Sequence, residues 1–126
     1  MKEYKNYFII NEKPEIVYRA LVNPLVIKLW TGFNAIMSEK IGEEFSLYDD
    51  SIVGHNLALK DGAYIEQEWY FGEQEQASIV SIKLHEHKKG TSLEFKQSNI
   101  PEEFYENIVD GLENIYMADL ISFFED

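Results

Sequence analysis

The chain has 126 residues, 45% of them hydrophobic and 14% aromatic, so it is long and apolar enough to form one domain over residues 1–126 with its own core. Its formal net charge of −12 repels phosphate groups, so we expect neither nucleic acid nor an anionic membrane as a partner. The chain has no cysteine and no apolar run that could insert into a membrane, which excludes disulfides and thiolate metal sites and predicts a cytoplasmic location.

The N-terminal quarter predicts one strand followed by two short helices. Residues 4–10 alternate loosely and are rich in aromatic and β-branched side chains, as is typical of a strand. Pro14 suits the first turn of a helix, where its missing N–H is not needed. An Asn23-Pro24 pair interrupts this helix and starts a second one, which runs to Trp30.

Alternating segments separated by turn residues fill the middle of the chain. Each places its apolar side chains on one face: residues 45–47, 52–59, 64–71, 80–84 and 93–97, with a weaker alternation at 33–37. The Asp61-Gly62 pair between two of these segments is a strong hairpin signal. We therefore expect about six strands in hairpins over this part of the chain.

The C-terminal segment predicts one long amphipathic helix from residue 102 to about residue 124. Pro101 starts it, and an apolar stripe at helical spacing follows, so we expect Ile108, Leu112 and Ile115 to be buried against the sheet. Strand, two helices, hairpins and one long helix together predict an α+β domain. In it, an antiparallel sheet curves around the C-terminal helix.

This order of elements is that of the helix-grip (START-like, Bet v-like) fold, and the chain resembles one family of that fold. It is similar to the Aha-type C-terminal domain found in activators of the heat shock protein 90 ATPase, within the START-like or SRPBCC superfamily. The segments that carry the likeness are residues 14–21, Trp30-Thr31-Gly32, residues 42–47, 52–56, 65–69 and 90–93, and Gly111 in the final helix. Together they span nearly the whole chain.

The resemblance has implications for function, and the chain departs from it in two respects. The family usually has Trp after the helix glycine, where this chain has Leu112. Eukaryotic activators also carry a separate N-terminal domain with an Asn- and Trp-rich stimulating motif, and nothing in these residues matches it. We therefore expect no strong stimulation of a chaperone ATPase by this chain alone. The wider superfamily resembles carriers of lipids, polyketides and hormones, which implies an apolar cavity between sheet and helix.

The residues expected to line such a cavity are mostly aromatic. They are Trp30, Phe33, Phe45, Trp69, Phe95, Leu112 and Tyr116, together with the polar His55, Gln67 and Gln97. Two interpretations of the aromatic residues remain open, an apolar pocket entered near residues 30–33 or an ordinary filled core.

Two amides are the most informative polar residues, because both fall on inward faces of predicted strands. Gln67 lies between Ile65 and Trp69, and Gln97 continues the face of Phe95. A buried amide without a partner costs about 1–3 kcal/mol. These side chains therefore either orient the polar end of a ligand or bond to each other, to backbone or to ordered water.

The three histidines do not form a recognisable catalytic or metal site. His85 and His87 share one strand face beside a Lys-Lys-Gly loop without an evident third ligand, and His55 has no evident acid or nucleophile. We therefore predict no metal and no cofactor. The leading hypothesis is a domain that binds an apolar or lipid-like small molecule without catalysis. The alternatives are a protein-interaction module or co-chaperone, and a minimal-cavity enzyme that uses Gln67 or His55 to polarise a substrate.

Overall fold

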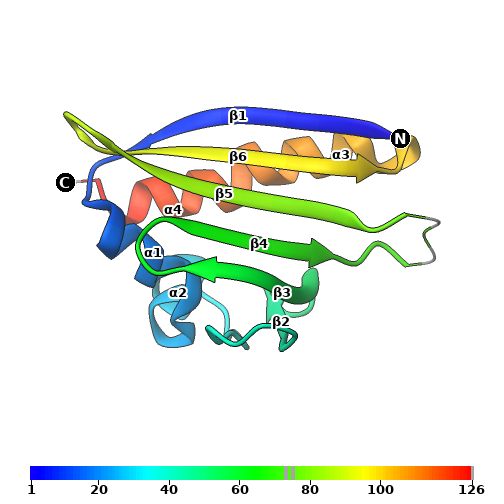
Figure 1. The fold of residues 1–126 in the computed structure, drawn as a ribbon, viewed down its shortest axis with the longest axis horizontal. Coiled ribbons are helices and arrows are strands. Elements are labelled where there is room, and N and C mark those ends of the chain that lie inside the picture. The colour runs from blue at the N-terminus through cyan, green and yellow to red at the C-terminus, as the bar shows by residue number, and fades with distance from the viewer. Residues whose placement is uncertain (73, 75, 126) are drawn as a thin grey trace.

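The computed structural model describes residues 1–72, 74 and 76–125, and its centre is one six-stranded antiparallel sheet. The strands lie in the order β1-β6-β5-β4-β3-β2 (Figure 1). Their bounds are β1 Lys2–Ile10, β2 Glu44–Leu47, β3 Ile52–Lys60, β4 Tyr64–Trp69, β5 Ser78–His87 and β6 Gly90–Ile100. The helices are α1 Pro14–Val22, α2 Pro24–Thr31 and a long C-terminal helix that crosses one face of the sheet. The predicted helix-grip fold is confirmed.

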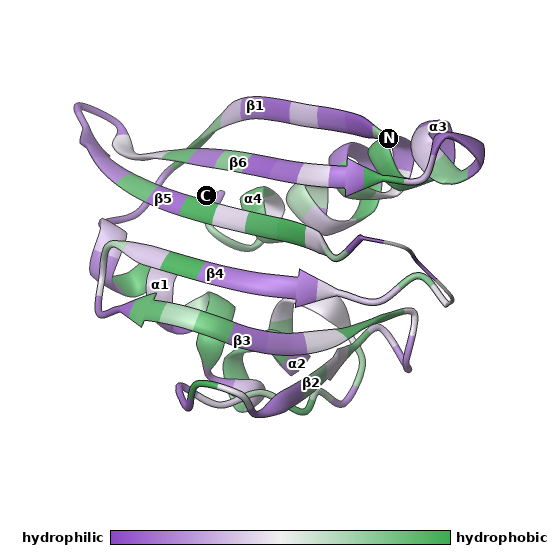
Figure 2. Cartoon of the chain, turned by 45° about the vertical axis from the view of Figure 1, so that its right-hand side comes forward, coloured by the Kyte–Doolittle hydropathy of each residue, from purple (hydrophilic) through white to green (hydrophobic). Residues whose placement is uncertain are grey.

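Strict alternation places the core on the helix side of the sheet. Val80, Ile82 and Leu84 of β5 are buried, while the residues between them are at least partly exposed. The same alternation of hydropathy is visible along the strands in Figure 2. In β4 the inward residues are Ile65, Gln67 and Trp69, as the sequence predicts.

The weak alternation at residues 33–37 does not produce a strand. Among the described residues, this segment contributes a single bridge, between Ile36 and Ser46. The hairpin region therefore holds the five strands β2 to β6 rather than about six. Met37 is buried, but Phe33 at the other end of the same face is exposed, so only part of the segment packs on the core.

The two short helices are held in place by their own prolines and by one tryptophan. The Asn23 side chain accepts a hydrogen bond of 2.9 Å from the Leu25 N–H and so caps α2, which Pro24 begins. Trp30 donates a 2.7 Å hydrogen bond from Nε1 to the carbonyl oxygen of Ala20, which ties α2 to α1. α2 then packs against the C-terminal end of the long helix.

The long helix is continuous from Glu102 to Phe123 but changes its winding along the way. A 3₁₀ turn (η1, Glu102–Phe104) leads into α3 (Tyr105–Gly111), a π turn (η2, Leu112–Tyr116) and α4 (Met117–Phe123). In the π turn the N–H of Met117 bonds to the carbonyl oxygen of Leu112, five residues earlier.

The π turn explains where the predicted apolar stripe departs from the observed one. Leu112 is buried and Ile108 is half-buried, but Ile115 is 50% exposed, so its predicted burial is wrong. A π turn holds one residue more than an α turn, so Tyr116 and Met117 take the buried positions that follow Leu112.

Gly54 is the point where the sheet requires a glycine. It lies opposite Phe45 of β2 and Trp69 of β4. A Cβ atom at this position would stand 1.9 Å from the carbonyl oxygen of Glu68 and 2.9 Å from the Phe45 ring. The missing side chain therefore lets the Phe45 ring lie against the strand, so the Gly54-His55-Asn56 motif has a structural role here.

The helices of the described residues show no membrane-spanning segment. None of them combines the length and the apolar composition needed to cross a bilayer.

Candidate functional site

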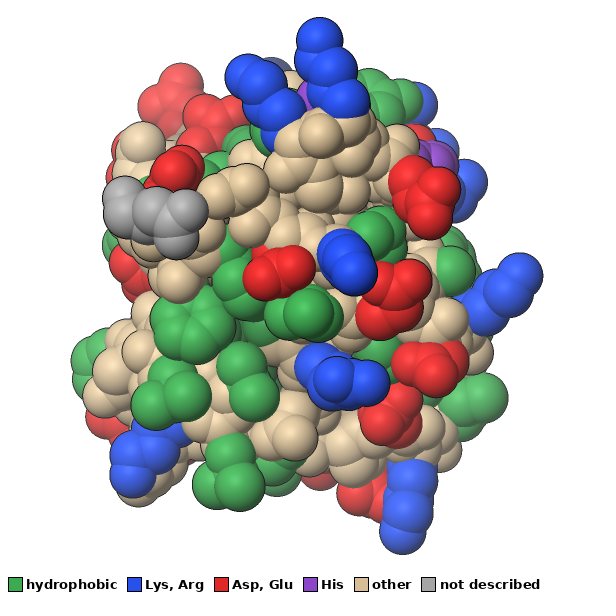
Figure 3. All heavy atoms as spheres, turned by 90° about the vertical axis from the view of Figure 1, so that its left-hand side faces the viewer, with side chains coloured by type: hydrophobic (Ala, Val, Ile, Leu, Met, Phe, Trp, Pro, Cys, Tyr) green, Lys and Arg blue, Asp and Glu red, His purple; other side chains and the backbone are tan. Residues whose placement is uncertain are grey.

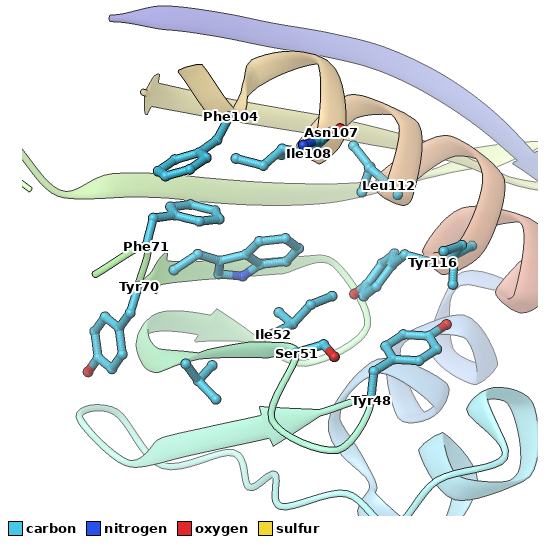
Figure 4. Close-up of a pocket in the computed structure, with 14 residues that line it drawn as sticks. Tyr48, Ser51, Ile52, Tyr70, Phe71, Phe104, Asn107, Ile108, Leu112 and Tyr116 are labelled. Carbon is cyan, nitrogen blue, oxygen red and sulfur yellow. The ribbon is translucent and has the colours of Figure 1, made fainter. Parts of the chain in front are cut away.

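An apolar groove beneath the long helix is the candidate site. It lies between the first half of that helix, the turn that joins β2 to β3, and the C-terminal end of β4 (Figure 4). Its volume is about 490 Å³. The lining residues are Tyr48, Ser51, Ile52, Val53, Trp69, Tyr70, Phe71, Phe104, Asn107, Ile108, Gly111, Leu112, Ile115 and Tyr116.

The helical wall follows directly from sequence spacing. Phe104, Ile108, Leu112 and Ile115 recur at intervals of three and four, so they project from one face of the helix into the groove (Figure 4). None of the lining residues that the structure describes carries a formal charge; the polar ones are Ser51, Asn107 and the tyrosines. The groove is therefore an uncharged apolar surface in a protein of net charge −12.

The floor of the groove is a packed aromatic cluster. The Trp69 ring lies 5.9 Å from the Phe95 ring and 6.0 Å from the Tyr116 ring, between centroids. Tyr116 also meets Trp30 edge to face at 5.5 Å. Such edge-to-face contacts fix ring orientation as well as bury apolar area. The floor therefore presents Trp69 and Tyr116 in defined positions.

A chain of hydrogen bonds behind the floor orients the Trp69 indole. Trp69 Nε1 donates to Gln67 Oε1 over 2.9 Å, and Gln67 Nε2 donates to Asn56 Oδ1 over 3.1 Å. Asn56 Nδ2 in turn donates to the carbonyl oxygen of Ser38 over 2.8 Å. Gln67 is buried and its amide is used within the protein, so it acts on the groove only through Trp69.

Gln97 has a different environment. It is fully buried on β6, and its Nε2 donates to Ser78 Oγ over 3.0 Å. Ser78 Oγ in turn donates a hydrogen bond to the carbonyl oxygen of Ser98. Within the described part of the chain, Gln97 Oε1 has no hydrogen-bond partner. Gln97 does not line the groove.

These two environments predict opposite results for the same substitution. Gln67→Met would leave Trp69 Nε1 and Asn56 Oδ1 without partners, and we expect it to lower the free energy of unfolding by about 2 kcal/mol or more. Gln97→Met removes the unpaired carbonyl while Ser78 keeps its bond to Ser98, so we expect stability to stay within about 1 kcal/mol of wild type. Urea denaturation followed by circular dichroism measures both. Equal losses in the two variants would contradict the assignment.

The structure brings three of the predicted cavity residues together in the groove. Trp69, Leu112 and Tyr116 line it. Three more, Trp30, Phe45 and Phe95, are buried in the packed core outside the lining.

The remaining aromatic candidate, Phe33, and the predicted entrance lie to one side of the groove. Phe33 is partly exposed and packs on Tyr48, with ring centroids 6.0 Å apart. None of residues 30–33 belongs to the lining. Phe33 contacts the lining residue Tyr48, and Trp30 contacts both Tyr48 and Tyr116, which line the groove.

The groove also contains residues that sequence reasoning did not select for it. Tyr48, Ser51, Ile52 and Val53 come from the turn before β3 and the start of that strand, and Tyr70 and Phe71 follow β4, which ends at Trp69. The available sequence signal was the length of the apolar stripe, which includes Phe104 and Ile115; the structure leaves both of them exposed. They mark the part of the helix that reaches beyond the sheet contact.

Among the described residues no histidine belongs to the groove lining, although His55 contacts the hydroxyl of the lining residue Tyr70. His55 is on the outer face of the sheet, where its Nδ1 stands 2.6 Å from the Tyr70 hydroxyl and its Nε2 3.9 Å from a Glu68 oxygen. His85 Nε2 is 3.1 Å from an oxygen of Glu94, which lowers the pKa of that carboxyl group. The described residues contain no cluster of three or more His, Asp or Glu side chains suited to a metal ion.

Gly111 contributes to the volume of the groove because it has no side chain. It has helical backbone angles, φ −62° and ψ −39°, so glycine is not required by the conformation. A Cβ atom added here would meet nothing within 4 Å. Packing does not require glycine either, and the absence of a side chain leaves space in the groove.

We expect Gly111→Ala to raise the free energy of unfolding by about 0.5–1 kcal/mol, because alanine restricts the unfolded chain and favours the helix. Urea denaturation measures the change. A loss of stability would mean that the position is already filled in solution.

Comparisons with other proteins add family and fold. A family model described as activator of Hsp90 ATPase homolog 1-like protein matches residues 11–125. No curated protein sequence matches the chain.

Solved structures share its architecture over almost their entire length. An HSP90 activator from Plasmodium falciparum superimposes with a TM-score of 0.84 at 19% identity, over 95% of this chain and 94% of that one. The Aha1 dimer from Colwellia psychrerythraea superimposes with a TM-score of 0.84 at 16% identity, over 99% of this chain and 97% of that one. Protein MLL2253 from Mesorhizobium loti superimposes with a TM-score of 0.79 at 19% identity, over 96% of this chain and 95% of that one. At these identities the likeness establishes the helix-grip fold alone.

Proposed function

The chain belongs to the family of activator of Hsp90 ATPase homolog 1-like proteins, as its sequence motifs predicted, and from this premise we propose that it is a binding domain for an apolar small molecule. The observation that carries the proposal is the uncharged groove of about 490 Å³ under the long helix. Small-molecule sites are concave, mostly apolar and of a few hundred Å³, with a few polar groups that set orientation. The groove has each of these properties.

Two features support a binding role over a packing defect. Phe104 and Ile115 leave large apolar surfaces in contact with water at the rim, and burying such surface gains about 25 cal/mol per Å². Trp69 is also held by a hydrogen bond to Gln67, which in turn bonds to Asn56, so the floor of the groove is ordered before anything binds. A site that is already ordered loses less entropy on binding.

We assign no catalytic step to the groove. Its lining, among the described residues, includes no His, Asp, Glu, Lys or Cys, so no side chain there has the chemistry of a general base near neutral pH. Gln67 and His55, the two residues considered for polarising a substrate, point elsewhere: Gln67 bonds to Trp69 and Asn56, and His55 lies on the outer face.

The proposal is tested by titration with Nile red, an uncharged apolar dye whose emission rises in an apolar site. We expect saturable binding of one dye per chain and partial displacement by apolar compounds extracted from the native host. Native mass spectrometry of protein purified from that host is the second arm, with a retained small molecule as the expected result. If the protein neither binds the dye nor retains a small molecule, the proposal is overturned.

A protein-interaction role is the second candidate, and a separate surface favours it. On α2 and the segment after it, large apolar side chains are left in water: Leu25 is 75% exposed and Leu29 70%, and Phe33, Ile36 and Ile41 are also exposed. Figure 3 shows apolar side chains gathered on the face of the molecule that carries α1 and α2. Exposed apolar patches often mark contact surfaces for other proteins.

Since one structural relative is an HSP90 activator, the partner to test is an Hsp90-type chaperone. If α2 makes the contact, Leu25→Ser with Leu29→Ser should abolish binding measured by surface plasmon resonance and leave thermal stability unchanged, because both side chains are exposed. We expect no large rise in chaperone ATP turnover from this chain alone. Equal binding by the double variant would remove α2 as the contact surface.

A further inference from the structure

Tyr116 is the polar residue at the inner end of the groove. It is the last residue of the π turn, and its side chain is only 4% exposed. Figure 4 shows its ring projecting from the long helix toward the turn that carries Ser51 and Ile52, with the hydroxyl at the leading end. Tyr116 therefore brings a hydroxyl group to a mostly apolar site.

The hydrogen bonding of Tyr116 differs from that of the buried Tyr4 and Tyr18 and the half-buried Tyr48. Tyr4, Tyr18 and Tyr48 each donate to a carboxylate, of Glu113 over 2.6 Å, Glu39 over 3.0 Å and Asp119 over 2.8 Å. Among the described residues no group accepts a hydrogen bond from the Tyr116 hydroxyl, and only burial acts on its pKa. The Tyr116 oxygen is not among the fully buried side-chain atoms that lack a partner, so it stays accessible from the groove. The protein leaves this one available to whatever occupies the groove.

The Tyr116 hydroxyl is a donor. Burial raises its pKa above the ordinary value, so the group keeps its proton throughout the neutral range. A protonated tyrosine hydroxyl can both donate and accept, and a ligand atom that uses its proton is a hydrogen-bond acceptor.

The charge of that acceptor is limited by the surroundings. In the described part of the chain no cationic side chain lines the groove, and Tyr48 at the same end is bonded to the carboxylate of Asp119. An anionic ligand group would be buried without a counter-charge, which is costly, and the net charge of −12 adds to the repulsion. A neutral carbonyl oxygen satisfies the tyrosine without this penalty.

The length of the apolar part follows from the helix. Phe104 and Tyr116 mark the two ends of the helical wall, and the 12 intervening steps of helix correspond to about 18 Å at 1.5 Å per residue. The rings of Phe71 and Phe104 lie together at the far end (Figure 4), and the Trp69 ring also belongs to the lining. These rings favour a flat or elongated apolar body.

We propose that the groove takes a neutral, elongated, apolar molecule whose carbonyl oxygen accepts a hydrogen bond from Tyr116, while its apolar body runs along the helix toward Phe104. This inference rests on the proposed binding function and adds the chemical class of the ligand and its orientation.

Three fluorescent naphthalene probes separate the parts of this proposal. Prodan is neutral and carries a ketone, N-phenylnaphthylamine is neutral without a carbonyl, and anilinonaphthalene sulfonate is anionic. We expect wild type to bind prodan most tightly and the sulfonate at least about tenfold more weakly than prodan, because the sulfonate's charge would be unpaired. The Tyr116→Phe variant removes only the hydroxyl. We expect it to weaken prodan binding about five- to tenfold, to shift bound prodan emission to the blue, and to leave N-phenylnaphthylamine affinity unchanged.

Tyr18→Phe is the matched control. It removes a buried tyrosine hydroxyl that donates to Glu39 and is not part of the groove, so the order of probe affinities should not change. If wild type binds neither neutral probe, the proposed function itself fails. If both neutral probes bind but Tyr116→Phe affects them equally, or not at all, the carbonyl contact is wrong while the groove stands. Tight binding of the sulfonate would contradict the proposal that the ligand is neutral. Probe binding that falls as protein concentration rises would show a second copy of the chain in the groove.

Discussion

Replacing Phe95 with alanine is expected to lower the free energy of unfolding by about 3–5 kcal/mol. Phe95 on β6 is fully buried and its ring meets three other aromatic rings, with centroids 6.2 Å away for Tyr4, 5.9 Å for Trp69 and 6.4 Å for Tyr116. Removing it deletes the common neighbour of these rings and leaves a cavity that they cannot close without leaving their positions.

The measurement is urea denaturation of Phe95→Ala beside Phe33→Ala, a control with the same chemical change at a partly exposed site. Phe33 contacts Tyr48 at the edge of the molecule, so its loss should cost about 1 kcal/mol or less. Similar losses for the two variants would mean that Phe95 is not the centre of the core.

The Phe95 variant also connects stability with function. Trp69 and Tyr116 form the floor of the groove, and both rest on Phe95. We therefore expect the folded fraction of Phe95→Ala to bind apolar probes more weakly than wild type, although Phe95 does not line the groove.

The elements of the fold were predictable because they depend on local periodicity. Alternation at residues 80–84 identifies the inward face of β5, and Asp61-Gly62 identifies the β3–β4 hairpin, where Gly62 has a φ of +74°. The long helix follows from a stripe at intervals of three and four. The one error in that stripe, Ile115, arises from a π turn, and no residue pattern in this segment predicts that extra residue.

The groove was less predictable because it depends on how distant segments meet. The inward position of Gln67 follows from alternation, but its partner does not, since Asn56 lies on the neighbouring strand beside a shift of register between Asn56 and Ala58. The lining joins the turn at residues 48–53 to the helix at 104–116, and their separation is set by the angle between helix and sheet. Sequence periodicity does not predict the angle between helix and sheet.

Gly111→Phe is expected to abolish binding of apolar probes while the domain stays folded. Gly111 lines the groove, has helical backbone angles, and its missing Cβ atom points into open space. A phenylalanine here would place its ring in the volume that a ligand needs, beside the apolar side chains of Ile108 and Ile115. The ring should gain burial of its own, and phenylalanine is a better helix former than glycine, so we expect unchanged or slightly higher thermal stability.

Two control variants isolate the effect of filling the groove. Gly111→Ala adds only one methyl group and should keep most of the probe affinity. Asn114→Phe adds the same ring on the same helix at an exposed position outside the lining, and it should bind probes as wild type does. We expect Nile red affinity to fall at least about a hundredfold in Gly111→Phe alone, a loss of about 2.7 kcal/mol of binding free energy. Full binding by that variant would place the dye outside the groove. A large loss of stability would show that the space at Gly111 is filled by protein in solution, and the exposed surface of α2 would then become the leading candidate for function.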